Sequence, residues 1–152
     1  MHTVKKLTLI DHENATMGPG AAPHLYGVLH DVLISLLPEG LGHIVVGSSC
    51  GGSPVMFAAS GFQGARHVFQ PGRDGAELAL VKFVNDHYAD LDVEELVIAS
   101  GDEAFLELAV AMQRRGTKIT VVANRGTLAK YLELIADEVH YLPRDWQMTY
   151  AA

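Results

Sequence analysis

Short apolar runs alternate with helical stretches along the whole chain, and this alternation constrains the fold more than any other feature. Runs typical of strands cover about Lys5–Ile10, His43–Val46, Arg66–Phe69, Glu95–Ala99, Lys118–Val122 and Glu138–Leu142. Stretches typical of helices cover about His24–Leu36, a short segment from Pro54, Asp74–Tyr88, a segment after Ser100-Gly101-Asp102 that ends near Arg115, and Thr127–Ile135. This order predicts a three-layer α/β/α sandwich on a mainly parallel sheet of about five to six strands.

Length and composition predict one globular domain. The chain has 152 residues, of which 49% are hydrophobic and 19% charged, and this is enough apolar material for a single core. We expect one domain over residues 1–152, with its core at about residues 5–143 and a short C-terminal tail.

The sequence also indicates the cellular compartment. No apolar run approaches the roughly 18–20 residues that span a membrane, and the apolar stretch after Met1–Lys6 is too short for a signal peptide. We therefore expect a cytoplasmic protein without a membrane partner. The single cysteine, Cys50, excludes an internal disulfide and a zinc site built from cysteines.

The formal net charge of −7 argues against strong non-specific binding of nucleic acid, which depends on lysine and arginine neutralising phosphates. It is compatible with a local site where carboxylates hold divalent cations.

The apolar run at Leu7–Ile10 ends abruptly in the polar sequence Asp11-His12-Glu13-Asn14. A run of this length is typical of a strand buried on both faces of a parallel sheet. Ligands of such sheets bind at the carboxyl ends of the strands. An acid directly after a buried strand has little structural use, so Asp11 is a candidate site residue.

Three further acids are expected near Asp11. Asp102 follows the fourth strand, and right-handed crossovers bring both strand ends to one edge of the sheet. Asp74 and Glu77 are predicted to lie in the first turn of the helix after the third strand, where they would share a face. Clustered carboxylates repel unless protons or a cation intervene, and Mg²⁺ prefers such oxygen ligands. First-turn acids also complement a helix dipole, which is the structural alternative for Asp74.

Several motifs, taken in order, resemble those of NYN domains in the PIN-like nuclease superfamily. The similar segments are Leu9-Ile10-Asp11-His12-Glu13-Asn14, Gly72-Arg73-Asp74-Gly75-Ala76-Glu77-Leu78-Ala79-Leu80, Ile98-Ala99-Ser100-Gly101-Asp102-Glu103-Ala104-Phe105, Gly116–Val122 and Ala136–Pro143. The resemblance covers about residues 5 to 143. It implies an α/β/α fold and cleavage of RNA that depends on Mg²⁺ or Mn²⁺.

Carried over by position, Asp11 and Asp102 match core acids of the family, and Asn14 matches its asparagine. The third acid falls on Asp74 in one subgroup and on Glu77 in another. Glu77 is favoured, because it leads directly into an apolar stretch as that subgroup's acid does. The resemblance thus implies Asp11, Glu77 and Asp102 as catalytic acids and metal ligands, with Asp74 and Asn14 assisting. Asn14 would be a neutral ligand or would orient Asp11.

One position departs from the family pattern. The second acid of its Ser-Gly-Asp-x-Asp-Phe motif is Ala104 in this chain. Glu103 is adjacent, but neighbouring side chains on a helix point about 100° apart. A second metal ion and the level of catalytic activity are therefore in doubt.

Substrate-binding candidates lie beside the acids. Ser100 and Asn14 belong to the motifs above, and Arg73 precedes Asp74. Arg125 lies at a predicted helix start, where phosphate could bind. The glycine-rich loop Gly47–Ser53 formally contains a Gly-x-Ser-x-Gly pattern, for which a phosphate-contacting loop or a plain turn is the better interpretation.

His12 in the first motif, and Trp146 and Tyr150 in the tail, remain to be interpreted. We expect His12 to be a solvated loop histidine. Trp146 and Tyr150 in the tail are expected to pack on the domain or on a second subunit, so a homodimer stays open.

The leading hypothesis is a metal-dependent ribonuclease acting on single-stranded RNA. The alternative is a catalytically degenerate module of the same fold that binds RNA or a protein partner, which Ala104 and the net charge motivate. A third interpretation is a phosphate-handling enzyme that acts on a nucleotide.

Overall fold

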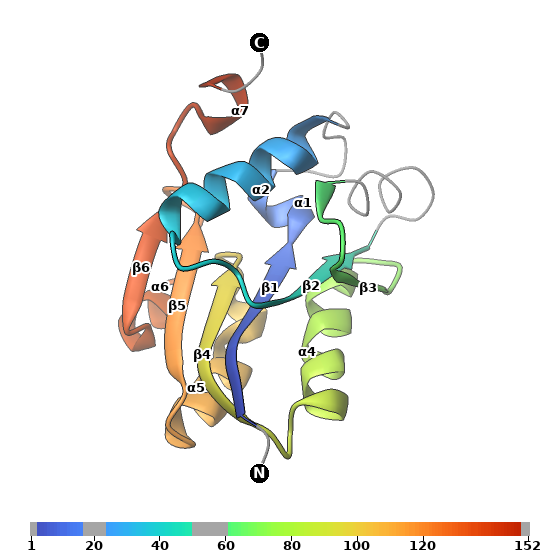
Figure 1. The fold of residues 1–152 in the computed structure, drawn as a ribbon, viewed down its shortest axis with the longest axis vertical. Helices are drawn as coiled ribbons and strands as arrows, with labels where there is room; N and C mark the ends of the chain where they lie inside the picture. Colours follow the sequence, from blue (N-terminus) through green and yellow to red (C-terminus); the bar gives the residue numbers. More distant parts are fainter. Residues whose placement is uncertain (1–2, 17–23, 50–60, 150–152) are drawn as a thin grey trace.

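The computed structural model describes residues 3–16, 24–49 and 61–149. Within them, six strands form one parallel sheet in the order β3-β2-β1-β4-β5-β6 (Figure 1). The strands are β1 Thr3–Asp11, β2 His43–Ser48, β3 Arg66–Phe69, β4 Asp92–Ala99, β5 Lys118–Ala123 and β6 Glu138–Tyr141. The predicted α/β/α sandwich is confirmed, and all strand pairs are parallel.

Helices cover both faces of this sheet. They are α1 His12–Ala15, α2 His24–Leu36, α4 Gly75–His87, the 3₁₀ turn η1 Glu103–Phe105, α5 Leu106–Arg114, α6 Lys130–Ile135 and α7 Trp146–Thr149. The short helix predicted from Pro54 lies outside the described residues. In this part of the chain, no helix has the length and apolar character that crossing a membrane requires.

Each face of the sheet has its own hydrophobic core. Ile10 and Val46 point to the face covered by α2 and α7, whereas Leu7 and Leu9 point to the face covered by α4, α5 and α6. This alternation follows from the two-residue period of a strand. Central strands that are apolar on both faces explain why the sequence shows short continuous apolar runs.

Several element boundaries differ by a few residues from the predicted ones. β1 extends through Asp11, and β4 begins at Asp92 because Thr3 and Asp92 still pair. Helix α6 begins at Lys130 rather than near Thr127, because Ala129 has an extended backbone and its N–H donates to the Gly101 carbonyl at 2.9 Å.

The tail folds back on the domain. Trp146, on α7, is 1% exposed and belongs to the core beneath α2, so of the two interpretations packing on the domain is confirmed for this residue. Gln147 Nε2 also donates to the Thr16 carbonyl at 3.1 Å. Tyr150 lies outside the described residues.

The Trp146→Ala variant should lose about 3–5 kcal/mol of the free energy of unfolding, because it removes a buried aromatic side chain and leaves a cavity. Chemical denaturation measures this loss. Met148→Ala, in the same helix, is the control: Met148 is 77% exposed and its loss should cost less than about 0.5 kcal/mol. Equal effects of the two substitutions would contradict the placement of Trp146.

Candidate metal centre

The order of the strands reverses next to β1. β1 lies between β2 and β4, and the connections that leave β1 and β4 diverge at this point. Open α/β sheets bind their ligands beside such a reversal, at the carboxyl ends of the strands. Asp11 is the last residue of β1 and Ser100 directly follows β4, so the predicted site residues lie at this edge.

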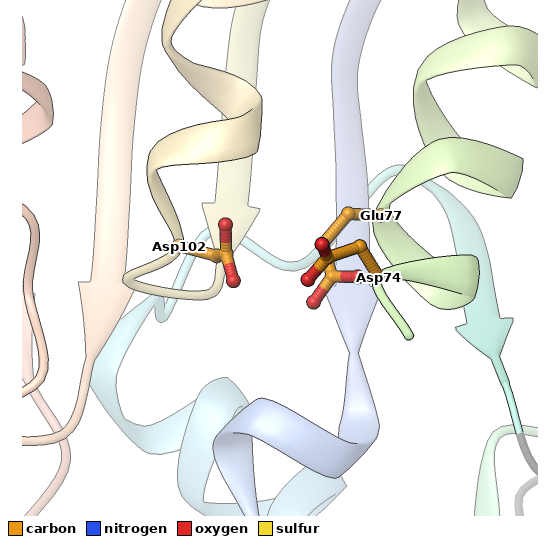
Figure 2. A group of neighbouring side chains, drawn as sticks. All are labelled: Asp74, Glu77 and Asp102. Carbon is orange, nitrogen blue, oxygen red and sulfur yellow. The ribbon is translucent and has the colours of Figure 1, made fainter. Parts of the chain in front are cut away.

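Three acids converge at this edge. Asp74, Glu77 and Asp102 each offer a carboxylate oxygen, and these oxygens lie within 4.8 Å of one another. Figure 2 shows Asp102, from the loop after β4, facing Asp74 and Glu77 at the start of α4. Asp74 is exposed, Asp102 is partly exposed and Glu77 is buried. Three hard oxygen donors at this separation can hold a metal ion.

Gly75 allows α4 to begin close to the sheet. A Cβ atom at this position would lie 1.9 Å from the Gln70 carbonyl oxygen, so a larger residue would push the helix start away. Asp74 precedes the helix with a left-handed backbone, φ 61°, and its side chain makes no capping hydrogen bond. The prediction that Asp74 lies in the first helical turn is therefore wrong, while Glu77 does lie there.

Asp74 is the one non-glycine residue with a positive φ in the described part of the chain. This conformation is costly for residues with a Cβ, although aspartate tolerates it better than most. A strained, exposed acid without a capping role is explained better by a ligand than by the helix dipole.

Asp102 is fixed by hydrogen bonds of its own loop. Its N–H donates to Ser100 Oγ at 3.1 Å, and its Oδ1 accepts from the Ala104 N–H at 2.8 Å. Gly101 packs tightly on the neighbouring loop, since a Cβ there would lie 2.6 Å from the Thr127 carbonyl oxygen. One oxygen of Asp102 is thus a helix cap.

Asp11 joins the three acids through Glu77. It is 1% exposed and accepts from Ser100 Oγ at 3.2 Å and from the Asn14 N–H at 3.3 Å. Burial, followed by the hydrogen bond and the charge of Glu77, raises the pKa of Asp11 to about 8. Near neutral pH and without a cation, Asp11 therefore keeps its proton.

Asn14 positions the loops. Its Oδ1 accepts from the Gly101 N–H at 3.2 Å, and Asn124 Nδ2 donates to the carbonyl oxygens of Asn14 and Ala15 at 3.3 and 2.9 Å. Of the two predicted roles, a neutral metal ligand or a residue that orients Asp11, this geometry favours orientation, because the backbone N–H of Asn14 holds Asp11.

The two predicted phosphate-binding arginines are exposed. Arg73 lies in the turn directly before Asp74. Arg125 lies 4.7 Å from the centroid of the Tyr141 ring, five residues before α6 begins. The prediction that Arg125 stands at a helix start is therefore wrong.

The sequence did not predict a pair of hydrogen bonds that join the segments after β1 and β2. Glu13 accepts hydrogen bonds from the backbone N–H of Ser49 at 2.6 Å and from its hydroxyl. Ser49 is the candidate nucleophile of the Gly-x-Ser-x-Gly pattern, but it bonds a carboxylate and not a histidine, which gives no support to the hydrolase interpretation. Cys50 and the rest of that loop lie outside the described residues.

His12 is also different from the prediction. It is fully buried and its Nε2 lies 2.7 Å from Ser48 Oγ, so the expectation of a solvated loop histidine is wrong. Burial lowers the pKa of His12, which favours the neutral ring. His12 begins the four-residue helix α1 directly after Asp11, and its ring packs edge-on against the Tyr26 ring with the centroids 5.0 Å apart.

Comparisons with known proteins give the fold and no function. No protein-family model matches the chain, and no curated protein matches it. A crystal structure of a protein of unknown function from Vibrio parahaemolyticus is similar, with a TM-score of 0.65 and 17% sequence identity. The similarity covers 95% of this chain and 96% of that one, so it supports the whole α/β architecture.

The pKa of Asp11 predicts a pH-dependent stability for the metal-free protein. The pKa of Asp11 in the folded protein lies above the usual value of 3.8. The contribution of its proton to the free energy of unfolding is therefore fully present below about pH 4 and is lost as the pH rises toward 8. The wild-type free energy of unfolding should therefore fall relative to that of Asp11→Asn, by at most about 1.4 kcal/mol per pH unit. Denaturation in EDTA between pH 5 and 8 measures this difference, and parallel curves for the two proteins would contradict it.

Replacing Asp74 separates backbone strain from charge. Asp74→Gly should raise the free energy of unfolding of the metal-free protein by about 1 kcal/mol relative to Asp74→Ala, because glycine adopts the left-handed region freely. Asp74→Asn should fall between them, since it removes the charge and keeps the backbone preference. Equal stability of the glycine and alanine variants in thermal melts would show that the position is not strained.

Proposed function

We propose that this chain is a metal-dependent ribonuclease of the NYN type, within the PIN-like superfamily. In this proposal Asp74, Glu77 and Asp102 bind Mg²⁺ or Mn²⁺, and the chain hydrolyses RNA phosphodiester bonds. The observation that carries it is the group of three carboxylates within 4.8 Å of one another at the edge where such sheets bind ligands.

The chemistry of the donors supports Mg²⁺ or Mn²⁺. The three side chains offer carboxylate oxygens alone, without the imidazole or thiolate donors that select zinc or copper. When bound, such an ion polarises a phosphate and activates water for in-line displacement. Cation binding would also release the proton held by Asp11, because its pKa is raised by burial and by the neighbouring charge of Glu77.

The remaining residues divide into positioning and substrate contact. Asp11 holds Glu77 by a hydrogen bond, and Ser100 holds both Asp11 and the backbone of Asp102. Asn14 ties the β1 end to Gly101. Arg73, exposed beside Asp74, is the candidate for a phosphate contact close to the acids.

A second function is favoured by one specific observation. Ala104 replaces the family's second acid, and its backbone N–H occupies Asp102 Oδ1 as a helix cap. An acid that caps a helix has a structural reason to be present. A catalytically degenerate module that binds RNA or a protein partner is therefore the alternative.

Cleavage of labelled single-stranded RNA tests the proposal. With Mg²⁺ or Mn²⁺ the wild-type protein should cleave, and EDTA should abolish cleavage. Asp102→Asn and Glu77→Gln should reduce the rate at least about 100-fold, because each removes a negative ligand. Asp11→Asn should reduce it too, since it disturbs the position of Glu77. The matched control is Asp90→Asn, an exposed acid before β4 at the opposite edge, which should cleave normally.

Metal binding is measured separately from cleavage. Millimolar Mg²⁺ or Mn²⁺ should raise the melting temperature of the wild type and not that of Asp102→Asn. A wild type that is stabilised by metal yet cleaves neither RNA oligomers nor mononucleotides would favour the degenerate module. Cleavage of mononucleotides alone would indicate the nucleotide-directed enzyme, and absence of any metal effect would refute the metal centre.

A further inference from the structure

Arg125 and Tyr141 form a stacked pair beside the acids. The guanidinium carbon of Arg125 lies 4.7 Å from the centroid of the Tyr141 ring, within the range of a cation–π contact. The Tyr141 hydroxyl donates to Glu133 Oε2 at 3.0 Å, which fixes the orientation of the ring. Arg125 is exposed and Tyr141 is partly exposed, so solvent reaches both.

This pair lies at the same sheet edge as the metal centre. Arg125 lies two residues after Ala123, the last residue of β5, and Tyr141 is the last residue of β6, paired with Ala123. The loop that carries Arg125 packs on the loop of Asp102, since the Ala129 N–H donates to the Gly101 carbonyl at 2.9 Å. Figure 1 shows β4, β5 and β6 side by side with α6 behind them.

The separation suits a single strand. Two strand spacings of about 4.8 Å separate the ends of β4 and β6, which gives about 10 Å along the edge. A stacked single strand rises about 3.4 Å per nucleotide. A phosphodiester at the acids would therefore bring a nucleotide about three positions away to the Arg125–Tyr141 pair.

Charge differs along this edge. The side near β1 and β4 carries Asp11, Asp74, Glu77 and Asp102, which repel phosphates unless a cation is bound. The side near β5 and β6 carries the exposed cations Arg125 and Arg144, together with the exposed acids Glu133 and Asp145. In a chain of net charge −7, exposed arginines at one sheet edge give a polyanion a place to bind.

We propose that the Arg125–Tyr141 pair is a subsite for one nucleotide of a single-stranded RNA, about three positions from the phosphodiester that lies at the acids. A base stacks on the outer face of the guanidinium, and the guanidinium N–H groups bind the adjacent phosphate. Tyr141 holds Arg125 flat for both contacts. This inference rests on the proposed ribonuclease function and adds where the substrate runs: from β1 and β4 toward β6.

Fluorescence anisotropy of a labelled single-stranded RNA of about ten nucleotides tests the subsite in millimolar Mg²⁺, with phosphorothioate linkages that resist cleavage so that binding alone is measured. Arg125→Ala and Tyr141→Leu should each weaken binding about tenfold, the scale of one stacked base. Tyr141→Phe keeps the ring and should bind like the wild type. Arg125→Lys keeps the charge but not the planar stack, and should bind as weakly as Arg125→Ala.

An oligomer with one abasic nucleotide identifies the stacked base. The abasic nucleotide is placed at each position of the RNA in turn. It should weaken binding to the wild-type protein at one position of the RNA, and it should have no effect on binding to Tyr141→Leu at any position. The matched controls are Tyr131→Leu, an exposed tyrosine of α6, and Arg114→Ala, an exposed arginine at the opposite edge. Both should bind like the wild type, and thermal melts check that every variant is folded.

The outcomes separate the subsite from the proposed activity. Wild-type affinity in Arg125→Ala and Tyr141→Leu would overturn the subsite, whether or not the protein cleaves RNA. Equal loss in the Arg114→Ala control would also overturn it, because the effect would be one of net charge. Specific loss in these variants, in a protein that never cleaves, would support the subsite and refute the nuclease.

Discussion

Asp11 and Glu77 can lie against each other inside this protein because Asp11 keeps its proton near neutral pH. Two buried carboxylates without a proton or a cation would repel strongly in a medium of low polarity. Ser100 and the Asn14 backbone bind the same carboxyl group of Asp11, and the loops after β1 and β4 are held together through them. The position of Glu77 depends on this arrangement. So does the spacing of Asp74, Glu77 and Asp102 at the carboxyl edge of the sheet. A cation would take over the role of the proton and relieve the same repulsion.

The rest of the fold brings these groups to one place by close backbone contacts. Gly75 lets α4 start directly over the Gln70 carbonyl, and Gly101 lets the β4 loop touch the loop at Thr127. The hydrogen bonds of Asn14 and Asn124 then connect three strand ends. The acids therefore sit on a scaffold fixed from both sides, as a site that must hold a ligand within a few tenths of an ångström requires.

The fold class could be predicted from the sequence because central strands buried on both faces leave continuous apolar runs, and because acids after Ile10 and Gly101 mark strand ends. Other features depend on tertiary contacts that no local pattern contains. The left-handed backbone of Asp74, the late start of α6 at Lys130 and the burial of His12 are of this kind. Trp146 was ambiguous because an aromatic residue in a tail fits a subunit contact as well as a core. The raised pKa of Asp11 follows from its burial and from its proximity in space to Glu77, 66 positions away, which the spacing in the sequence does not give.

The burial of Trp146 beneath α2 has a consequence for how the chain folds during synthesis. The apolar underside of α2 is synthesised about 110 residues before Trp146, whose side chain completes the same core. Until that residue emerges, a nascent chain exposes apolar surface beside a parallel sheet whose pairings are all non-local, and such sheets form slowly. Chaperone binding to nascent chains should therefore persist until α7 is available, and ribosome stalling before it should favour aggregation.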